Sequence, residues 1–556
     1  MQPNRNRALR NNVVAMLLVT AAATAAACSA DNGGGEAVGS TSGALSPQVQ
    51  NGRDIWLKAT FGGEKFFSLA LPQAPFNLTL GFVNALTTPR AQRFTQWGLV
   101  NDPDCSDGDA TTGGFDRCPD PSATGVVGIR KGPDPTGTHP FLLGVACAGC
   151  HAGLSAQNPP GDPNHPAWDN IDLTTGNQYI QAGKIFSANL PPADPRWQVF
   201  HTWAAGAVDT TAIESDGINN PGIITQFFEF PERPYFSPHS SLVNLANFGD
   251  GTPAQAHRAG QGGEDDVGCQ LAALRVYFNI GMCAAECMIP HLANGLNGTQ
   301  TPIDLQQCAT VCPDLVQAET AVVDECAFIN NGPATPSPSL EKAPGGAQHI
   351  DHGAAQRGGE VFESTCASCH SNGSPGPLND YTDDLVHVAS GFNPLGELPG
   401  DVGTNKCRAL STNWDGGHIW AEFSSDELKA RGPGYSRDVP LLGIWATAPF
   451  FHNNRLGAPS SDPSVAGRLA AFDDAYSQLV NPWTRDLAGS VQVTTVPITV
   501  NGLTLPAGTP VALFANLDPT TFQLRCDDLV ENGGHYFGAL LSPDDKNALK
   551  EYLKTL

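Results

Sequence analysis

The chain contains two copies of the pattern Cys-x-x-Cys-His, one at residues 147–151 and one at residues 366–370. Each copy provides two thiols for covalent attachment and one metal ligand directly behind them, which is what a c-type haem requires. A redox-active disulfide needs no following histidine, and a zinc site needs further ligands close to each motif. The two motifs therefore predict two covalently bound haems.

Six residues would hold these two groups. They are Cys147, Cys150 and His151 for the first haem, and Cys366, Cys369 and His370 for the second. In each set the cysteines would form the covalent links, and the histidine would be the proximal ligand of the iron.

The opposite face of each iron separates electron transfer from catalysis, because a carrier fills that face with methionine or histidine and a catalytic haem leaves it open. Beyond the leader the sequence has two methionines, Met282 and Met288, both in the cysteine-rich hairpin expected in the first domain. We therefore expect two histidine ligands at the second haem. The candidates are His418, His452 and His535, and for each the alternative is an ordinary loop histidine.

The N-terminus has the features of a bacterial export signal. Arginines precede an apolar run, Val13–Ala27, which small residues connect to Cys28. We expect residues 1–28 to be a signal peptide of the lipoprotein type, with Cys28 acylated, and residues 29–50 to be a flexible tether. Plain secretion after a nearby cut is the alternative. The expected location is the periplasm, the outer membrane or the extracellular space, with membrane contact only through the lipid.

The net charge of −25 argues against nucleic acid or an anionic membrane as a partner, because phosphate groups are bound by basic surfaces. An acidic surface can attract a small basic redox protein. The expected partners are such a protein or a small-molecule oxidant.

Cysteine usage indicates an oxidising compartment. Without Cys28 and the four motif cysteines, ten of the fifteen remain, which is compatible with five disulfides. Cysteines four residues apart share a helix face, so two such pairs can staple two helices together. The alternative for this four-cysteine group is a metal cluster. The predicted disulfides are Cys283–Cys312, Cys287–Cys308, Cys269–Cys326, Cys105–Cys118 and Cys407–Cys526.

A proline-rich stretch around residues 331–348 separates the two motifs. We expect an N-terminal haem domain at 51–335, a linker at 336–348 and a C-terminal cytochrome c domain at 349–556. The 60 glycines and 45 prolines predict long ordered loops between the helices. The fold class is therefore mainly α, with extensive ordered loops, two cytochrome c-like haem domains and minor β-hairpins.

Local patterns predict several elements within these domains. Alternating β-formers around Asn501 and Gly502 predict a hairpin within 491–514. Apolar spacing and capping residues predict four helices, within 270–293, 305–328, 353–373 and 542–556.

Two further stretches carry a likeness to a known family. The sequence "VPLLGIWATAPFFHNN" at 439–454 resembles a segment of the dihaem cytochrome c peroxidase and MauG superfamily, and the C-terminal stretch from "HYFGALLS" onward resembles its last helix. With "GVACAGCHAG", "LRVYFNIG" and "LPAGTPVALFANLDP", the pattern is most similar to the branch that contains the dihaem rubber oxygenases. The likeness covers most of the mature chain.

The resemblance implies roles for particular residues. In that branch the second haem has a distal histidine near the C-terminus, which matches His535 better than His452. The first haem is the reactive one there, with an apolar distal face that includes a phenylalanine, and Phe278 is the match. The superfamily also commonly holds a calcium ion between its domains, which makes Ca²⁺ a further candidate.

The implied function is that of an oxidoreductase whose first haem activates O2 or peroxide while the second relays electrons. The alternative is a non-catalytic electron-transfer cytochrome. The chain departs from the branch at a six-cysteine insert directly after "LRVYFNIG". Rubber as a substrate therefore does not carry over.

Overall fold

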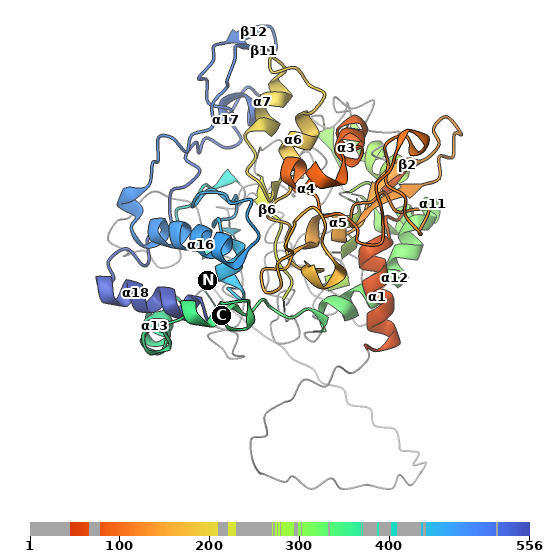
Figure 1. Cartoon of the computed structure of the whole chain (residues 1–556). Coiled ribbons are helices and arrows are strands. Elements are labelled where there is room, and N and C mark those ends of the chain that lie inside the picture. Colours follow the sequence, from red (N-terminus) through yellow and green to blue (C-terminus); the bar gives the residue numbers. More distant parts are fainter. Residues whose placement is uncertain are drawn as a thin grey trace, which may run out of the picture. The chain divides into compact units, whose positions relative to one another are not determined.

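Helices make up most of the regular structure, and short two-stranded hairpins make up the rest (Figure 1). The computed structural model describes residues 45–65, 78–209, 219, 221–228, 269–270, 273–274, 276–278, 280–293, 299–301, 303–331, 334–367, 370, 386–387, 402–407, 435–436, 441–518 and 521–556. Residues 45–556 group as one unit by their internal contacts.

The described α-helices are mostly short. They are α1 (Pro47–Lys58), α2 (Gly63–Lys65), α3 (Leu78–Leu86), α4 (Arg90–Trp97), α5 (Ala148–His151), α6 (Ala182–Ser187), α7 (Pro195–His201), α11 (Leu305–Val311), α12 (Pro313–Ile329), α13 (His352–Thr365), α15 (Ile444–Thr447), α16 (Val465–Val480), α17 (Ala512–Ala515) and α18 (Pro543–Leu553).

Side-chain caps determine where the longer helices begin. Ser542 caps α18 by accepting a hydrogen bond from the Asp545 amide at 3.1 Å, and Pro543 occupies the first turn, where no amide donor is needed. Asp351 caps α13 in the same way through the Ala354 amide. These caps satisfy amides that have no partner inside the helix.

Two pairs of helices pack closely along each other. Helix α1 packs along α12, and α13 packs along α18 (Figure 1). Each contact is close because a glycine faces a backbone carbonyl. A Cβ atom on Gly52 would lie 1.9 Å from the Asp324 oxygen, and one on Gly358 would lie 2.0 Å from the Ala548 oxygen.

Within the described residues, the strands form six two-stranded antiparallel sheets. They are β1 (Ile129–Gly132) with β2 (Leu142–Val145), β3 (Gly153–Leu154) with β4 (Ile171–Asp172), β5 (Ala207–Val208) with β6 (Gly222–Ile223), β7 (Leu292–Ala293) with β8 (Thr299–Gln300), β9 (Val386–His387) with β10 (Tyr435–Ser436), and β11 (Ile498–Val500) with β12 (Leu503–Leu505). The last confirms the hairpin predicted at Asn501 and Gly502, whose φ values of 49° and 79° suit a two-residue turn.

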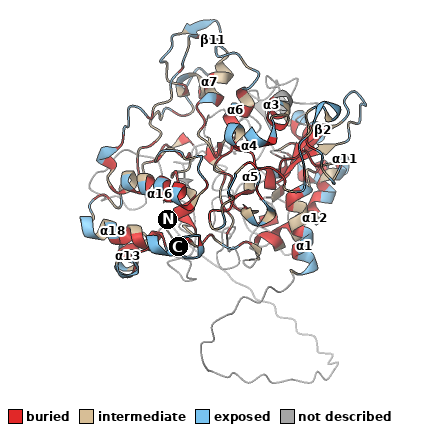
Figure 2. Cartoon of the chain, viewed as in Figure 1, coloured by how far each residue is buried: buried red, intermediate tan, exposed pale blue. Residues whose placement is uncertain are grey.

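Buried apolar side chains form two large cores. Figure 2 colours the buried segments of the chain red. The first runs from Val49 to Ile329, and the second is built mainly from Leu340 to Leu553. The chain passes from one core to the other within the stretch expected to be a linker. Leu340 and Ala343 in that stretch are themselves buried in the second core.

All five predicted disulfides are present. They are Cys105–Cys118, Cys269–Cys326, Cys283–Cys312, Cys287–Cys308 and Cys407–Cys526. The sulfur atoms of three of these cysteines lie within 4.8 Å of one another, but the disulfides already use them, so the metal-cluster alternative is not favoured. Five disulfides indicate an oxidising compartment.

Two predicted helices are interrupted. The expected helix 305–328 is divided into α11 and α12, because Cys312 is extended and Pro313 cannot donate the next helical hydrogen bond. The expected helix 270–293 gives way to turns at Gly281, followed by a π-helical turn at Ala284–Met288. Gly281 and Cys283 have φ values of 114° and 54°, which no right-handed helix accommodates.

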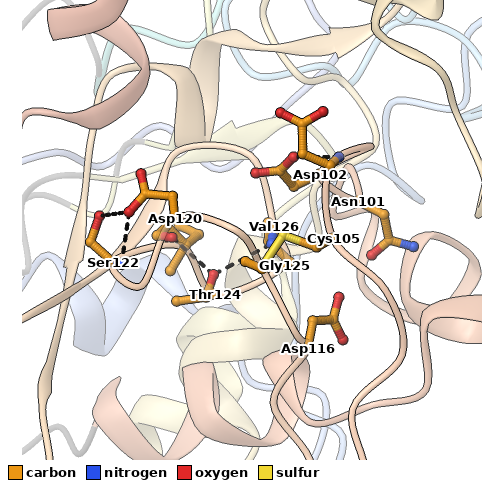
Figure 3. Close-up of a disulfide and its surroundings, with 12 residues drawn as sticks. Asn101, Asp102, Cys105, Asp116, Asp120, Ser122, Thr124, Gly125 and Val126 are labelled. Atoms are coloured by element: carbon orange, nitrogen blue, oxygen red, sulfur yellow. Dashed lines mark hydrogen bonds between the residues drawn. A yellow bond between two sulfur atoms is a disulfide. The ribbon is translucent and has the colours of Figure 1, made fainter.

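Figure 3 shows the acidic segment around the Cys105–Cys118 disulfide. Its carboxylates already have partners. Asp116 bonds two buried arginines, at 2.5 Å to Arg90 and 2.9 Å to Arg93, and Asp120 accepts from Ser122. This arrangement stabilises the loop through buried ion pairs, and calcium stays an expectation of the resemblance alone.

Several predictions fall on residues outside those described. They include the signal peptide and tether up to residue 44, the second-motif cysteine Cys369 and the candidate ligand His418. Among the described helices, none combines the length and apolar character that crossing a membrane would need.

Candidate functional site

The first Cys-x-x-Cys-His motif lies at the end of hairpin β1–β2. Strand β2 leads directly into the single-turn helix α5, which ends at His151. Cys147 and Cys150 form no disulfide, whereas ten other cysteines are paired in five disulfides. Gly128 lies so close to this turn that a Cβ atom there would meet the Gly149 amide nitrogen at 2.0 Å. The β-turn backbone thus fixes the motif helix in place.

The His151 ring is oriented by one backbone contact. Its Nδ1 lies 2.9 Å from the carbonyl oxygen of Thr225, so Nδ1 carries the proton and donates it. That tautomer leaves Nε2 with a free lone pair, as a metal-binding histidine requires. Burial lowers the pKa of His151 to about 4, which keeps the imidazole neutral.

Aromatic rings surround this histidine. The ring of Phe227 lies 4.7 Å from the His151 ring and that of Trp56 lies 5.6 Å away, measured between centroids. Trp56 is held in turn by a hydrogen bond from its indole nitrogen to the Leu173 carbonyl at 2.5 Å. Packing on these sides leaves the imidazole few orientations.

Sequence reasoning did not identify a buried acidic group beside the first motif. Both carboxylate oxygens of Glu325 lie 3.1 Å from the Tyr277 hydroxyl, and both side chains interact with the Cys147 thiol. Burial raises the pKa of Glu325 to about 7. The sequence does contain one sign of this burial. Glu325 lies on the apolar face of α12, between the buried Val322 and Phe328.

The residues that could lie on the other face of the first iron belong to the first core. Phe278, Met282 and Met288 are all buried there. The Met282 amide donates to the Tyr277 carbonyl at 2.8 Å. Met282 therefore lies close to Tyr277, whose side chain interacts with Cys147. The predicted distal residue Phe278 is therefore next to Tyr277 in a dry, packed region.

At the second motif, two of the predicted histidines are brought together. The ring centroids of His370 and His535 lie 6.2 Å apart, with 47° between the ring planes. Two imidazoles that bind one metal ion from opposite sides, each at about 2.0 Å, have centroids roughly 6 Å apart. The spacing therefore fits a six-coordinate iron between the rings. Helix α13 leads into this motif, and Cys366 is its C-cap residue.

His535 is held in an unusual backbone conformation. Its φ is 53°, and its amide donates to the Val402 carbonyl at 2.6 Å. Its buried Nδ1 has no hydrogen-bond partner within the described part of the chain. Burial, followed by the neighbouring His370, lowers the pKa of His535 to about 3. A neutral, buried imidazole with an unused ring nitrogen is suited to bind a metal.

Arg485 positions the loop that carries His535. Its Nη1 donates to the carbonyls of Asn532 and Gly534, at 3.1 and 2.6 Å. Its guanidinium also lies 5.4 Å from the ring centroids of Phe451 and Tyr536. These contacts fix the backbone on both sides of the histidine.

His452, the alternative ligand, takes part in a connection between the two motifs. Its carbonyl accepts from the Ile223 amide at 2.6 Å, and two residues later the Thr225 carbonyl accepts from His151. A short segment that begins at β6 thus connects the loop that carries His452 to His151 of the first motif.

No family model matches the chain, and a search of curated proteins finds no match.

Proposed function

We propose that the chain is a c-type cytochrome with two haems that acts as an oxidoreductase. The pairing of His370 with His535 at 6.2 Å carries the proposal, because two imidazoles at that spacing suit one iron and burial lowers the pKa of His535. The unpaired thiols at Cys147 and Cys150 support it, because the chain forms five disulfides from other cysteines.

The two haems would have different tasks. Bound haem supplies one-electron chemistry and, where a coordination position is open, a site for O2 or peroxide. His370 and His535 would close both positions of the second iron and make it an electron relay. His151 would hold one side of the first iron, and the buried side chains around Phe278 would exclude water from a reacting oxidant.

A second candidate, a non-catalytic electron carrier, is favoured by one contact. Met282 lies close in the chain to Tyr277, which interacts with Cys147, and a methionine can fill the sixth position of a haem. In that case protein ligands would fill the sixth coordination position of both irons. The two candidates agree on the second haem and differ only at the first.

The first test is haem content and spin state. The mature chain, produced with c-type haem maturation, should carry two covalent haems by the pyridine haemochrome assay. Electron paramagnetic resonance should show one low-spin haem with two histidines and one high-spin haem, and reduced protein should bind CO. Two low-spin haems without CO binding would support the electron carrier. If a Met282→Leu variant of that protein then binds CO, Met282 is the sixth ligand of the first haem.

The second test assigns the histidine. His535→Ala should convert the second haem from low spin to high spin, because it removes the proposed sixth ligand, whereas His452→Ala should leave the low-spin signal in place. The opposite result would transfer the ligand role to His452. A chain that carries no haem after maturation would overturn the proposed function itself.

A further inference from the structure

Arg468 on α16 is a fully buried charged group without a charged partner. Its Nε donates to the Ala446 carbonyl at 2.9 Å, and its Nη2 donates to Gln178 at 3.0 Å and to the Ala448 carbonyl. Its Nη1 is also buried, and no acceptor for it is found among the residues that the structure describes. Every acceptor that Arg468 contacts is a neutral carbonyl or amide oxygen.

A comparison within the chain shows how unusual this is. Arg93 is equally buried, and both of its Nη atoms bond the carboxylate of Asp116 at 2.9 Å. A buried guanidinium with no counter-ion costs several kcal/mol of solvation, which chains normally recover by pairing the charge. The environment of Arg468 thus calls for an anion, and no described residue supplies one.

A second unsatisfied donor lies beside it. The Arg468 guanidinium lies 5.6 Å from the centroid of the Tyr179 ring, and the buried Tyr179 hydroxyl donates its proton to no acceptor in the described part of the structure. Burial raises the pKa of Tyr179, and Arg468 opposes that rise through its charge and through a hydrogen bond to the Tyr179 oxygen, so the two side chains are in contact. A guanidinium without a carboxylate partner and a phenol proton without an acceptor at the same place indicate a missing anion.

The location connects this place to both haem motifs. The Asn177 amide donates to the Cys150 carbonyl at 2.9 Å, so the segment that carries Gln178 and Tyr179 lies against the first motif. Helix α16 belongs to the second core, against which Cys366 packs. Arg468 therefore lies between the two predicted haems.

We propose that Arg468 and Tyr179 bind a carboxylate, and that this carboxylate is a propionate of one of the two haems. A carboxylate accepts from both donors and neutralises the guanidinium, whereas a buried water would satisfy the hydrogen bonds but leave the charge uncompensated. This inference rests on the proposed function, because the propionate belongs to the haem.

The test measures the midpoint potentials of both haems by optical redox titration in Arg468→Met and Tyr179→Phe. Loss of a positive charge, or of a hydrogen-bond donor, beside a propionate stabilises the ferric state. Each variant should therefore shift the potential of the same haem in the negative direction, and the shift should be larger for Arg468→Met. Arg468→Lys keeps the charge and should shift it least.

Stability provides an independent readout in Tyr179→Phe, which keeps the ring and removes only the hydroxyl. If the hydroxyl has no partner in the mature protein, its removal should be neutral or stabilising. If it donates to a carboxylate, the melting temperature should fall. Arg357→Met is the matched control, since it removes a surface arginine paired with Asp545 and should leave both potentials unchanged.

The outcomes separate this inference from the proposed function. Two bound haems with unchanged potentials in both variants would overturn the propionate site and leave the proposed function intact. A chain without haem would overturn both. If Arg468→Met does not fold, the potentials of Tyr179→Phe test the propionate site alone. The spectrum of His535→Ala identifies the signal of the second haem and so shows which haem has the shifted potential.

Discussion

Glu325 places a carboxyl group on the apolar face of α12, where burial raises its pKa to about 7 from a usual value of 4.5. The folded chain therefore holds this proton more tightly than the unfolded chain. The stability that results is complete below about pH 4.5 and is lost as the pH rises through 7. The shift corresponds to roughly 3 kcal/mol of unfolding free energy.

We expect Glu325→Gln to remove this pH dependence, because the amide stays neutral and can still bond Tyr277. Denaturant unfolding at pH 5, 6, 7 and 8 would show the wild type losing stability more steeply than the variant. Tyr277→Phe is the control, since it keeps the titrating group and should keep the slope. Parallel curves for wild type and Glu325→Gln would mean that Glu325 is ionised throughout.

Single residues also show where prediction from sequence ends. Three C-terminal histidines were candidates for the second iron, and family resemblance alone favoured His535. What places this ring opposite His370 is a left-handed backbone at His535 and the packing of Gly534, whose added Cβ would meet the Thr404 amide nitrogen at 2.3 Å. Such conformations depend on contacts between distant segments, which local propensities do not encode.

At the scale of elements, α13 and α18 offer a matched pair of glycines. A Cβ atom on Gly358 would lie 2.0 Å from the Ala548 oxygen in α18, whereas one on Gly359 would lie 3.4 Å from the Tyr552 ring. Gly358→Ala should therefore force the two helices apart and cost about 1–3 kcal/mol. Gly359→Ala should be tolerated or add up to about 1 kcal/mol, because alanine is the better helix former.

Unfolding by denaturant, followed by circular dichroism, would measure both changes. Because the two positions are adjacent on one helix, they share its propensity and its cap at Asp351. Equal effects of the two substitutions would contradict the close packing of α13 on α18.

Helices with clear capping residues and apolar spacing could be predicted from the sequence. Segments whose conformation depends on disulfides were harder to predict. The terminal helix α18 follows from Ser542, Pro543 and its apolar spacing. The four-residue cysteine spacing predicted both staples correctly. It did not predict the π-helical turn, because the left-handed conformation of Cys283 arises where its disulfide and Gly281 bend the chain.

At the scale of the whole molecule, the five disulfides close loops of very different size. Cys407–Cys526 spans a sequence separation of 119, and Cys105–Cys118 spans 13. The chain-entropy account assigns about 4.7 kcal/mol to a loop of about 100 residues and about 3 kcal/mol to one of about 15. The larger loop should contribute more to stability.

We therefore expect the double alanine variant of Cys407 and Cys526 to lose more unfolding free energy than that of Cys105 and Cys118. Chemical unfolding of the two variants beside the wild type measures the difference. If the smaller loop costs more, its packing against the buried Asp116 ion pairs outweighs loop entropy, and the expected order is wrong.

The segment that joins His452 to His151 has a consequence for how the protein is made. The Thr225 carbonyl orients His151, and Ile223 in the same segment donates its amide to the His452 carbonyl in the C-terminal half. During synthesis the first motif emerges long before that contact can form. If the chain binds haem as proposed, the first motif would receive its covalent group early, but His151 would reach its final orientation only after the C-terminal half has been made and has packed, so maturation at the first motif would end late.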